Sequence, residues 1–175
     1  MRVALRVHPD TPSNAVSRIE VEVESTNPGK LALHYRVTGE IGEILLPPPA
    51  ASTRADDLWQ HSCFEAFLRD TSGTGYHEFN FAPSTQWAAY RFKDYREGRS
   101  LAAVTAPIIG ARADVGCYEL QATLAWAGPA RMGLSAVIEE RSGRKSYWAL
   151  AHPPGDPDFH HSDCFALQLP PAVRP

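Results

Sequence analysis

A two-residue alternation of apolar and charged side chains most constrains what this chain can fold into. Residues 19–24 read Ile-Glu-Val-Glu-Val-Glu, so an apolar side chain alternates with a carboxylate throughout. Successive side chains of an extended strand point to opposite faces, whereas a helix would spread these carboxylates around its circumference. The same alternation recurs at residues 3–7, 31–37 and 118–126. These four segments are therefore predicted to be strands.

Further segments combine aromatic and β-branched residues and are separated by turn-forming Gly, Pro, Ser and Asp. They are residues 63–68, 76–81, 87–92, 132–139, 146–152 and 165–169. About ten short strands, with only a helical turn near residues 55–60, predict an all-β, antiparallel β-sandwich of the jelly-roll or immunoglobulin-like type. The 175 residues fit one domain, residues 1–175.

Charge and composition exclude several classes of partner. The formal net charge is −3, so the chain lacks the basic excess that neutralises nucleic-acid phosphates or anionic lipid headgroups. Residues 1–12 lack the apolar stretch of a secretory signal, and no apolar run reaches transmembrane length. The three cysteines form no Cys-x-x-Cys pair. We therefore expect a cytoplasmic protein that binds neither nucleic acid nor membranes.

The strands predicted at residues 63–68, 76–81 and 87–92 separate into two faces when their side chains are sorted by parity. The expected core face carries Phe64, Ala66, Leu68, His77, Phe79, Phe81, Ala88, Tyr90 and Phe92. The opposite face carries Cys63, Glu65, Phe67, Tyr76, Glu78, Asn80, Trp87, Ala89 and Arg91. Aromatic rings beside bidentate polar groups suit a sugar or another polar small molecule. A solvated face with ordinary cross-strand ion pairs is the alternative.

Individual members of this face are expected to have different roles. Glu65 is costly to bury without a partner, and Arg91 is the partner expected for it. Trp59 and Trp87 are the candidates for stacking on a ligand, whereas Trp148 shares the parity of core residues. The candidate ligand-binding residues are Trp59, Glu65, Tyr76, Glu78, Asn80, Trp87, Arg91, Tyr95, Arg96, Trp148 and His152.

Several blocks of the sequence, in this order and spacing, resemble a known family. The blocks are Leu58-Trp59, Cys63–Phe67, Tyr76–Ser84, Trp87–Phe92, Tyr95-Arg96, Tyr147–Pro153 and Pro157–His160. The chain is similar to bacterial DOMON-like domain proteins, which are related to the type 9 carbohydrate-binding modules. The resemblance implies a jelly-roll β-sandwich whose relatives bind sugars or haem. Haem-binding relatives use Met and His as axial ligands, and Met132 is the only internal methionine here.

Catalysis has two candidate locations. His152, Asp158, His160 and His161 offer ligand types that bind zinc or another divalent metal, without a recognised spacing. Glu65 and Glu78, on adjacent strands, could act as an acid–base pair if their environments separate their pKa values. The sequence favours a small-ligand-binding module over a metal-assisted enzyme, a haem protein or a protein-interaction scaffold. It identifies no cofactor.

Overall fold

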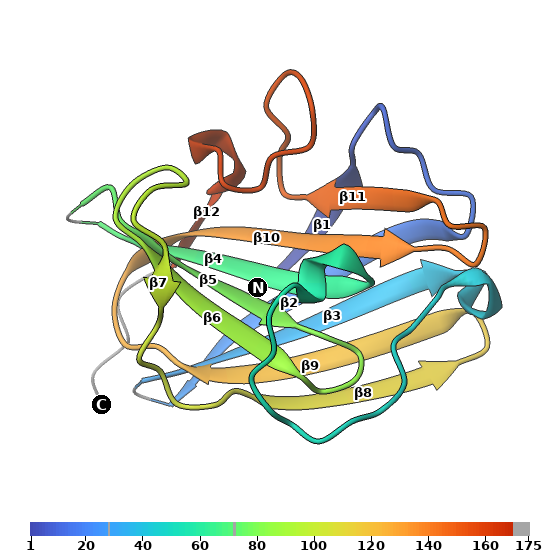
Figure 1. The fold of residues 1–175 in the computed structure, drawn as a ribbon, viewed down its shortest axis with the longest axis horizontal. Coiled ribbons are helices and arrows are strands. Elements are labelled where there is room, and N and C mark those ends of the chain that lie inside the picture. Colours follow the sequence, from blue (N-terminus) through green and yellow to red (C-terminus); the bar gives the residue numbers. More distant parts are fainter. Residues whose placement is uncertain (28, 72, 170–175) are drawn as a thin grey trace.

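The computed structural model describes residues 1–27, 29–71 and 73–169, and this part of the chain is all-β (Figure 1). The strands are β1 (Arg2–Val7), β2 (Val16–Asn27), β3 (Lys30–Gly39), β4 (Cys63–Asp70), β5 (Tyr76–Phe81), β6 (Trp87–Phe92), β7 (Ser100–Leu101), β8 (Ile108–Asp114), β9 (Cys117–Ala125), β10 (Ala130–Glu139), β11 (Lys145–Ala149) and β12 (Leu167–Leu169). The described helices are single 3-10 turns, η1 (Ile41–Glu43), η2 (Leu58–Gln60) and η3 (Ser162–Cys164). None of these described helices has the length and apolar character needed to cross a membrane.

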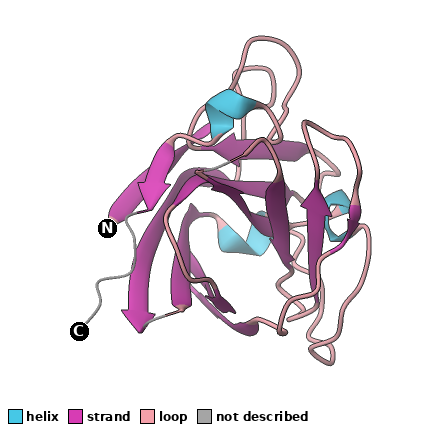
Figure 2. Cartoon of the chain, turned by 90° about the vertical axis from the view of Figure 1, so that its left-hand side faces the viewer, coloured by secondary structure: helices cyan, strands magenta, loops and turns pink. Residues whose placement is uncertain are grey.

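The strands form one 12-stranded antiparallel sheet in the order β7-β6-β5-β4-β10-β11-β1-β2-β3-β9-β8, with β12 paired to β10. β1 joins the two halves, because Arg2 to Leu5 pair with β2 whereas Arg6 and Val7 pair with β11. The sheet curls into a half-barrel, so that β4, β5, β6 and β10 lie across from β2, β3 and β9 (Figures 1 and 2).

The main hydrophobic core fills the space between these two halves. Phe64 of β4 lies 5.1 Å from the ring of Tyr35 and 5.9 Å from the ring of Tyr118, measured between centroids. The Tyr35 hydroxyl donates a hydrogen bond of 2.7 Å to the backbone oxygen of Glu65. The predicted inward positions of β4 and β5 are confirmed, and His77 at their edge packs against Trp126.

All ten segments predicted as strands contain strands, and β5 and β6 have the predicted bounds. β7 and β8 were not predicted. β7 is only two residues long, too short for an alternation to appear. β8 (Ile108–Asp114) is exposed along most of both faces and contains Gly110, Ala111 and Ala113, so it lacks the apolar stripe that marks a half-buried strand.

The side chains of β6 point to the opposite faces from those predicted. Trp87 pairs with Phe81 and Ala89 pairs with Phe79, so both face the main core. Trp87 is only 6% exposed and lies 4.4 Å below the guanidinium of Arg54. The prediction is wrong because connecting segments also cover the other face of β6. The side chains on both faces of β6 are therefore largely buried, so their hydrophobicity does not show which face contacts the main core.

Candidate functional site

Buried polar side chains cross β10, β4 and β5 on the side turned away from the main core, which we call the polar face. Ser135, Glu65 and Asn80 are direct cross-strand neighbours, and Glu78 is two residues from Asn80 on β5. Their exposed fractions are 1% for Ser135, 3% for Glu65, 1% for Asn80 and 7% for Glu78. Ser135 Oγ donates to Glu65 Oε2 at 3.0 Å, and Asn80 Nδ2 donates to Glu78 Oε1 at 2.8 Å.

Connecting segments cover the polar face and give it a second, smaller apolar cluster. Phe165, which follows η3, packs on Phe67 and Tyr76, with ring centroids 6.0 and 5.5 Å away. Leu58 of η2 and Phe159 join the same cluster. The segments around residues 93–99 and 151–166 lie side by side above this face (Figure 1), and hydrogen bonds link them. The predicted face is therefore enclosed by loops rather than solvated.

Four residues connect these two segments to β5 in a closed cycle of hydrogen bonds, which we call the loop network: Tyr76, Arg96, Asp158 and His160. The backbone nitrogen of Arg96 donates to the Tyr76 hydroxyl at 3.2 Å, and this hydroxyl lies 2.8 Å from His160 Nδ1. The backbone nitrogen of His160 donates to Asp158 Oδ1 at 3.0 Å. Arg96 Nη2 donates to the same oxygen at 2.8 Å, which closes the cycle.

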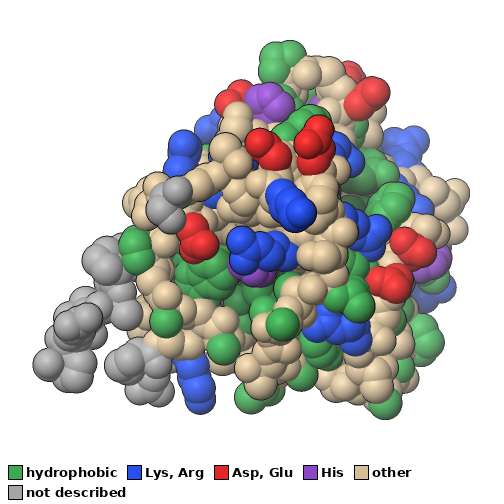
Figure 3. All heavy atoms as spheres, turned by 60° about the vertical axis from the view of Figure 1, so that its left-hand side comes forward, with side chains coloured by type: hydrophobic (Ala, Val, Ile, Leu, Met, Phe, Trp, Pro, Cys, Tyr) green, Lys and Arg blue, Asp and Glu red, His purple; other side chains and the backbone are tan. Residues whose placement is uncertain are grey.

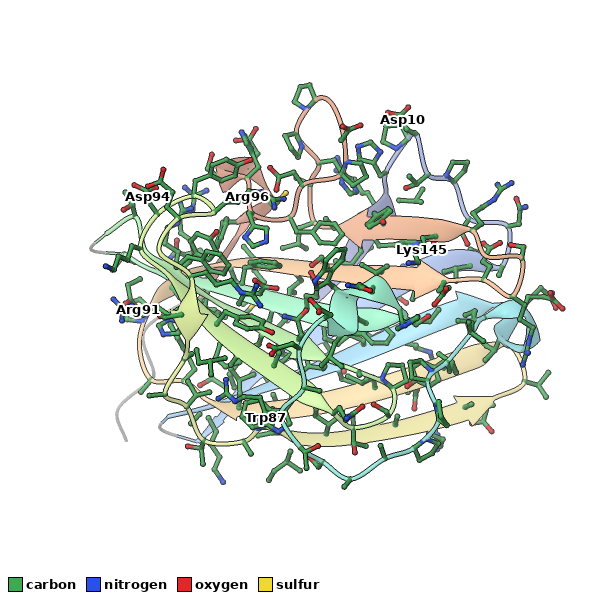
Figure 4. The ribbon with its side chains drawn as sticks, in the orientation of Figure 1. Asp10, Trp87, Arg91, Asp94, Arg96 and Lys145 are labelled. Atoms are coloured by element: carbon green, nitrogen blue, oxygen red, sulfur yellow. The ribbon has the colours of Figure 1, made fainter. Side chains whose placement is uncertain are left out.

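A surface pocket lies on the outer side of the loop network. It is lined by Tyr95, Arg96, Pro153, Pro154, Asp156, Pro157, Asp158 and His161. The Tyr95 hydroxyl donates to Asp158 Oδ2 at 2.5 Å, and the residue is 47% exposed. Figure 4 places Arg96 near η3, and Figure 3 shows acidic, basic and histidine side chains mixed over this upper part of the molecule. The pocket thus combines the aromatic ring of Tyr95 with the Arg96 and Asp158 side chains, which hydrogen bonds hold in place.

Burial sets the protonation of the polar face. Burial, followed by the charge of Glu78, raises the pKa of Glu65 to about 8, although the Ser135 hydrogen bond opposes this. Burial also raises the pKa of Glu78, but the Asn80 hydrogen bond and the charges of Arg99 and Arg96 lower it. The pKa values of the two carboxyls are therefore expected to separate, with Glu65 holding the proton at neutral pH.

We assign His160 as a neutral imidazole whose ring proton is on Nε2. Burial, helped by the charge of Arg96, lowers the pKa of His160 to about 4. The Tyr76 hydroxyl accepts from the Arg96 backbone, so its own proton is available for His160 Nδ1. The remaining ring proton is then on Nε2, which lies 3.9 Å from Glu78 Oε2.

The structure brings together part of the predicted ligand-binding set. Glu65, Tyr76, Glu78 and Asn80 lie on the polar face, and Tyr95 and Arg96 lie beside it. The predicted contact between Glu65 and Arg91 is wrong. Arg91 pairs with His77 on the opposite face of β6 and is exposed (Figure 4). Like Trp87, it is separated from Glu65 by the sheet itself.

The other candidates lie outside the polar face. Trp148 is in the main core, as its parity indicates, and its Nε1 donates to Ser146 Oγ at 3.0 Å. Trp59 is 49% exposed on η2 and does not line the surface pocket. His152 Nε2 donates to the backbone oxygen of Arg6 at 2.8 Å, and its ring packs edge-on against His8.

The predicted metal and haem ligands do not converge. Within residues 1–27, 29–71 and 73–169, no three His, Cys, Asp or Glu side chains are close enough to hold a metal ion. His160 faces Tyr76 and Glu78, whereas His161 Nδ1 accepts from the backbone nitrogen of Asp163. Met132, the candidate haem ligand, is 0% exposed in the main core. These positions give the metal and haem hypotheses no geometric support.

Several residues around the polar face were not predicted. Ser135 lies within an apolar stretch of β10. A serine in such a stretch indicates a side chain that is buried and hydrogen-bonded, and this signal could have identified it. Tyr90 was assigned to the core face by the incorrect phase of β6. Its ring is covered by the Arg99 guanidinium at 3.9 Å, and its hydroxyl donates to Asp56. Nothing local in the sequence marks Arg99 or Asp56.

Comparison with known proteins supports the fold class. No family model matches this sequence, and no curated protein matches it. The structure is similar to the crystal structure of a putative carbohydrate-binding protein from Bacteroides uniformis ATCC 8492, with a TM-score of 0.65. The two chains are 15% identical, and the match covers 94% of this chain and 83% of the other. The protein thus has an all-β fold like that of the Bacteroides protein.

Proposed function

We propose that the protein is a small-ligand-binding module and that its ligand is a polar small molecule of the carbohydrate class. The observation that carries this proposal is the half-exposed Tyr95 ring beside the Arg96–Asp158 pair in the surface pocket. Such a ring offers a flat apolar surface to a sugar. Beside it, the guanidinium and carboxylate offer donors and acceptors that the loop network holds in place.

The fold and the sequence resemblance support the same proposal. The Bacteroides structure is that of a putative carbohydrate-binding protein, and the blocks between Leu58 and His160 resemble DOMON-like proteins. We extend the proposal to a jelly-roll β-sandwich of this type, a single domain over residues 1–175, and a cytoplasmic location. The charge of −3 supports a small ligand rather than a nucleic acid.

Calorimetric titration with a panel of methyl glycosides and soluble oligosaccharides tests the assignment of the pocket. Tyr95→Ala is expected to weaken binding about tenfold or more, because it removes the stacking surface. Trp59→Ala is the matched control, since Trp59 is equally exposed (49% against 47%) but does not line the pocket. Loss of binding in Trp59→Ala alone would move the site to η2. A panel that shows no binding to the wild type would contradict the carbohydrate class.

A further inference from the structure

We propose that the polar face contains a buried subsite for one hydroxyl group of the ligand, formed by Glu78 Oε2 and the Nε2–H of His160, with the Glu65 carboxyl on the neighbouring strand. This inference rests on the proposed function, because it assigns the inner part of the same ligand site. His160 connects the two parts, since it lies between Asp158 and His161, which both line the surface pocket.

Unused hydrogen-bonding atoms point to this subsite. Glu78 Oε1 accepts from Asn80, whereas Oε2 lies 3.9 Å from His160 Nε2, which is too long for a hydrogen bond. Glu65 Oε2 accepts from Ser135, and Oε1 has no hydrogen-bond partner among the described residues. Both side chains are more than nine-tenths buried. Neither oxygen is among the fully buried atoms that lack a partner, so each keeps some accessible surface and can accept from a group that enters from outside.

A hydroxyl group has the required donor and acceptor pattern. It can donate to Glu78 Oε2 and accept from the Nε2–H of His160, and one oxygen can bridge two atoms 3.9 Å apart with bonds of ordinary length. Glu65 then supplies a second neighbouring donor or acceptor, depending on its protonation. The subsite is not sealed, because 9% of the Glu78 side chain and 15% of the His160 side chain remain exposed.

The surrounding charges favour a hydroxyl over a cation or an anion. The positive charges of Arg96 and Arg99 act on Glu78 and His160, and they disfavour an ammonium group or a metal ion at the same place. The Glu78 carboxylate disfavours an anionic group. The described residues also provide no cluster of three metal-ligating side chains here. An uncharged polyol, such as a sugar, is the class that fits.

Glu78→Gln tests the subsite, because it keeps the shape of the side chain but removes the carboxylate charge and replaces one acceptor with a donor. For the methyl glycosides of glucose, galactose, mannose and xylose that bind the wild type, we expect affinity to fall about tenfold or more. Glu139→Gln is the matched control, since Glu139 forms a carboxylate–histidine pair with His61 outside the site. Thermal denaturation of each variant establishes that it is folded.

A second measurement separates the subsite from the proposed function. Glycerol titrated into 15N-labelled protein is expected to shift the Nε2–H signal of His160, and the shift should disappear in Glu78→Gln. If Tyr95→Ala weakens glycoside binding but Glu78→Gln does not, the subsite is overturned and the proposed function stands. A His160 signal unchanged by glycerol also overturns it. A melting temperature that rises with calcium or magnesium chloride only when Glu78 is present would assign the subsite to a cation.

Discussion

At the scale of single residues, Glu65 links burial to pH-dependent stability. Its pKa is raised to about 8 in the folded chain, above the ordinary value near 4.3 of an unfolded chain. The native state therefore binds this proton more tightly than the unfolded state. The resulting stabilisation is fully present below about pH 4 and is lost as the pH rises toward 8.

Glu65→Gln is expected to remove this dependence. At pH 9 the variant should be more stable than the wild type by up to about 5 kcal/mol, because an amide carries no charge to bury. The difference should narrow toward pH 5. Melting temperatures measured from pH 5 to 9 test this, with the exposed Glu24→Gln as the control. Equal pH profiles for wild type and Glu65→Gln would contradict the raised pKa.

The Tyr76 hydroxyl connects β5 to both loops of the loop network, because it bonds to the Arg96 backbone and to His160. Tyr76→Phe leaves the Arg96 backbone nitrogen and His160 Nδ1 without a partner. We expect a loss of about 1–3 kcal/mol in unfolding free energy and a mixture of His160 tautomers. Urea denaturation and imidazole 15N shifts measure the two effects. Tyr147→Phe is the control, because Tyr147 belongs to the same apolar cluster but its hydroxyl has no described partner; equal losses would contradict the network's role.

At the scale of elements, residues 53–55 form a strap, a short segment that bonds along the start of β6 and occupies its backbone groups. The backbone of Trp87 bonds to Thr53 and Ala55, at 3.1 and 2.9 Å. The Arg54 guanidinium donates to the backbone oxygens of Ala89 and Ala102 at 2.8 and 3.0 Å. These bonds satisfy backbone groups near the β7 end of the sheet that would otherwise invite pairing with another chain.

Arg54→Ala is expected to lower the unfolding free energy by about 2–3 kcal/mol, because it removes two charge-assisted hydrogen bonds and the stacking on Trp87. Arg54→Lys should recover only part of this loss, since an ammonium group cannot bridge both oxygens in the same way. Urea denaturation followed by tryptophan fluorescence measures both variants. Full recovery by lysine would mean that positive charge, rather than the forked geometry, holds the strap.

The strands were predictable because each has a local signal, whereas their faces depend on pairing. β2 and β3 show a clean alternation because one face contacts the core and the other contacts water. β6 is buried on both faces, so its composition located the strand but did not show which side chains face the core. The pairing of Trp87 with Phe81 follows from the turn at residues 82–86, and a shift of one residue reverses every side chain.

At the scale of the whole molecule, Phe64 joins the two halves of the curled sheet. It is 0% exposed and contacts Tyr35 and Tyr118 on the facing strands. Phe64→Ala is expected to lower the free energy of unfolding by about 3–5 kcal/mol.

If residues 1–175 form one cooperative domain, circular dichroism and fluorescence should lose signal in a single shared transition on denaturation. Two separated transitions would divide the chain into independent units.

The sequence identified the chemistry of the site better than its shape. Burial of Glu65 was expected to be costly, and the structure meets this cost with Ser135 and a raised pKa rather than with Arg91. Tyr95 and Arg96 were identified from the resemblance and their residue types. Their contact with Asp158 spans more than sixty residues of sequence, and no local pattern encodes such a contact.

The loop network has a consequence for the order of folding. Its bonds join residues 84 positions apart, for Tyr76 and His160, and 62 apart, for Arg96 and Asp158. Long-range closures form late, after the local hairpins that reduce their entropic cost. A chain emerging from the ribosome would therefore complete the β4–β6 meander before residues 158–160 are available. The proposed binding site would therefore be completed late, so ligand binding, if the proposal holds, would report complete folding.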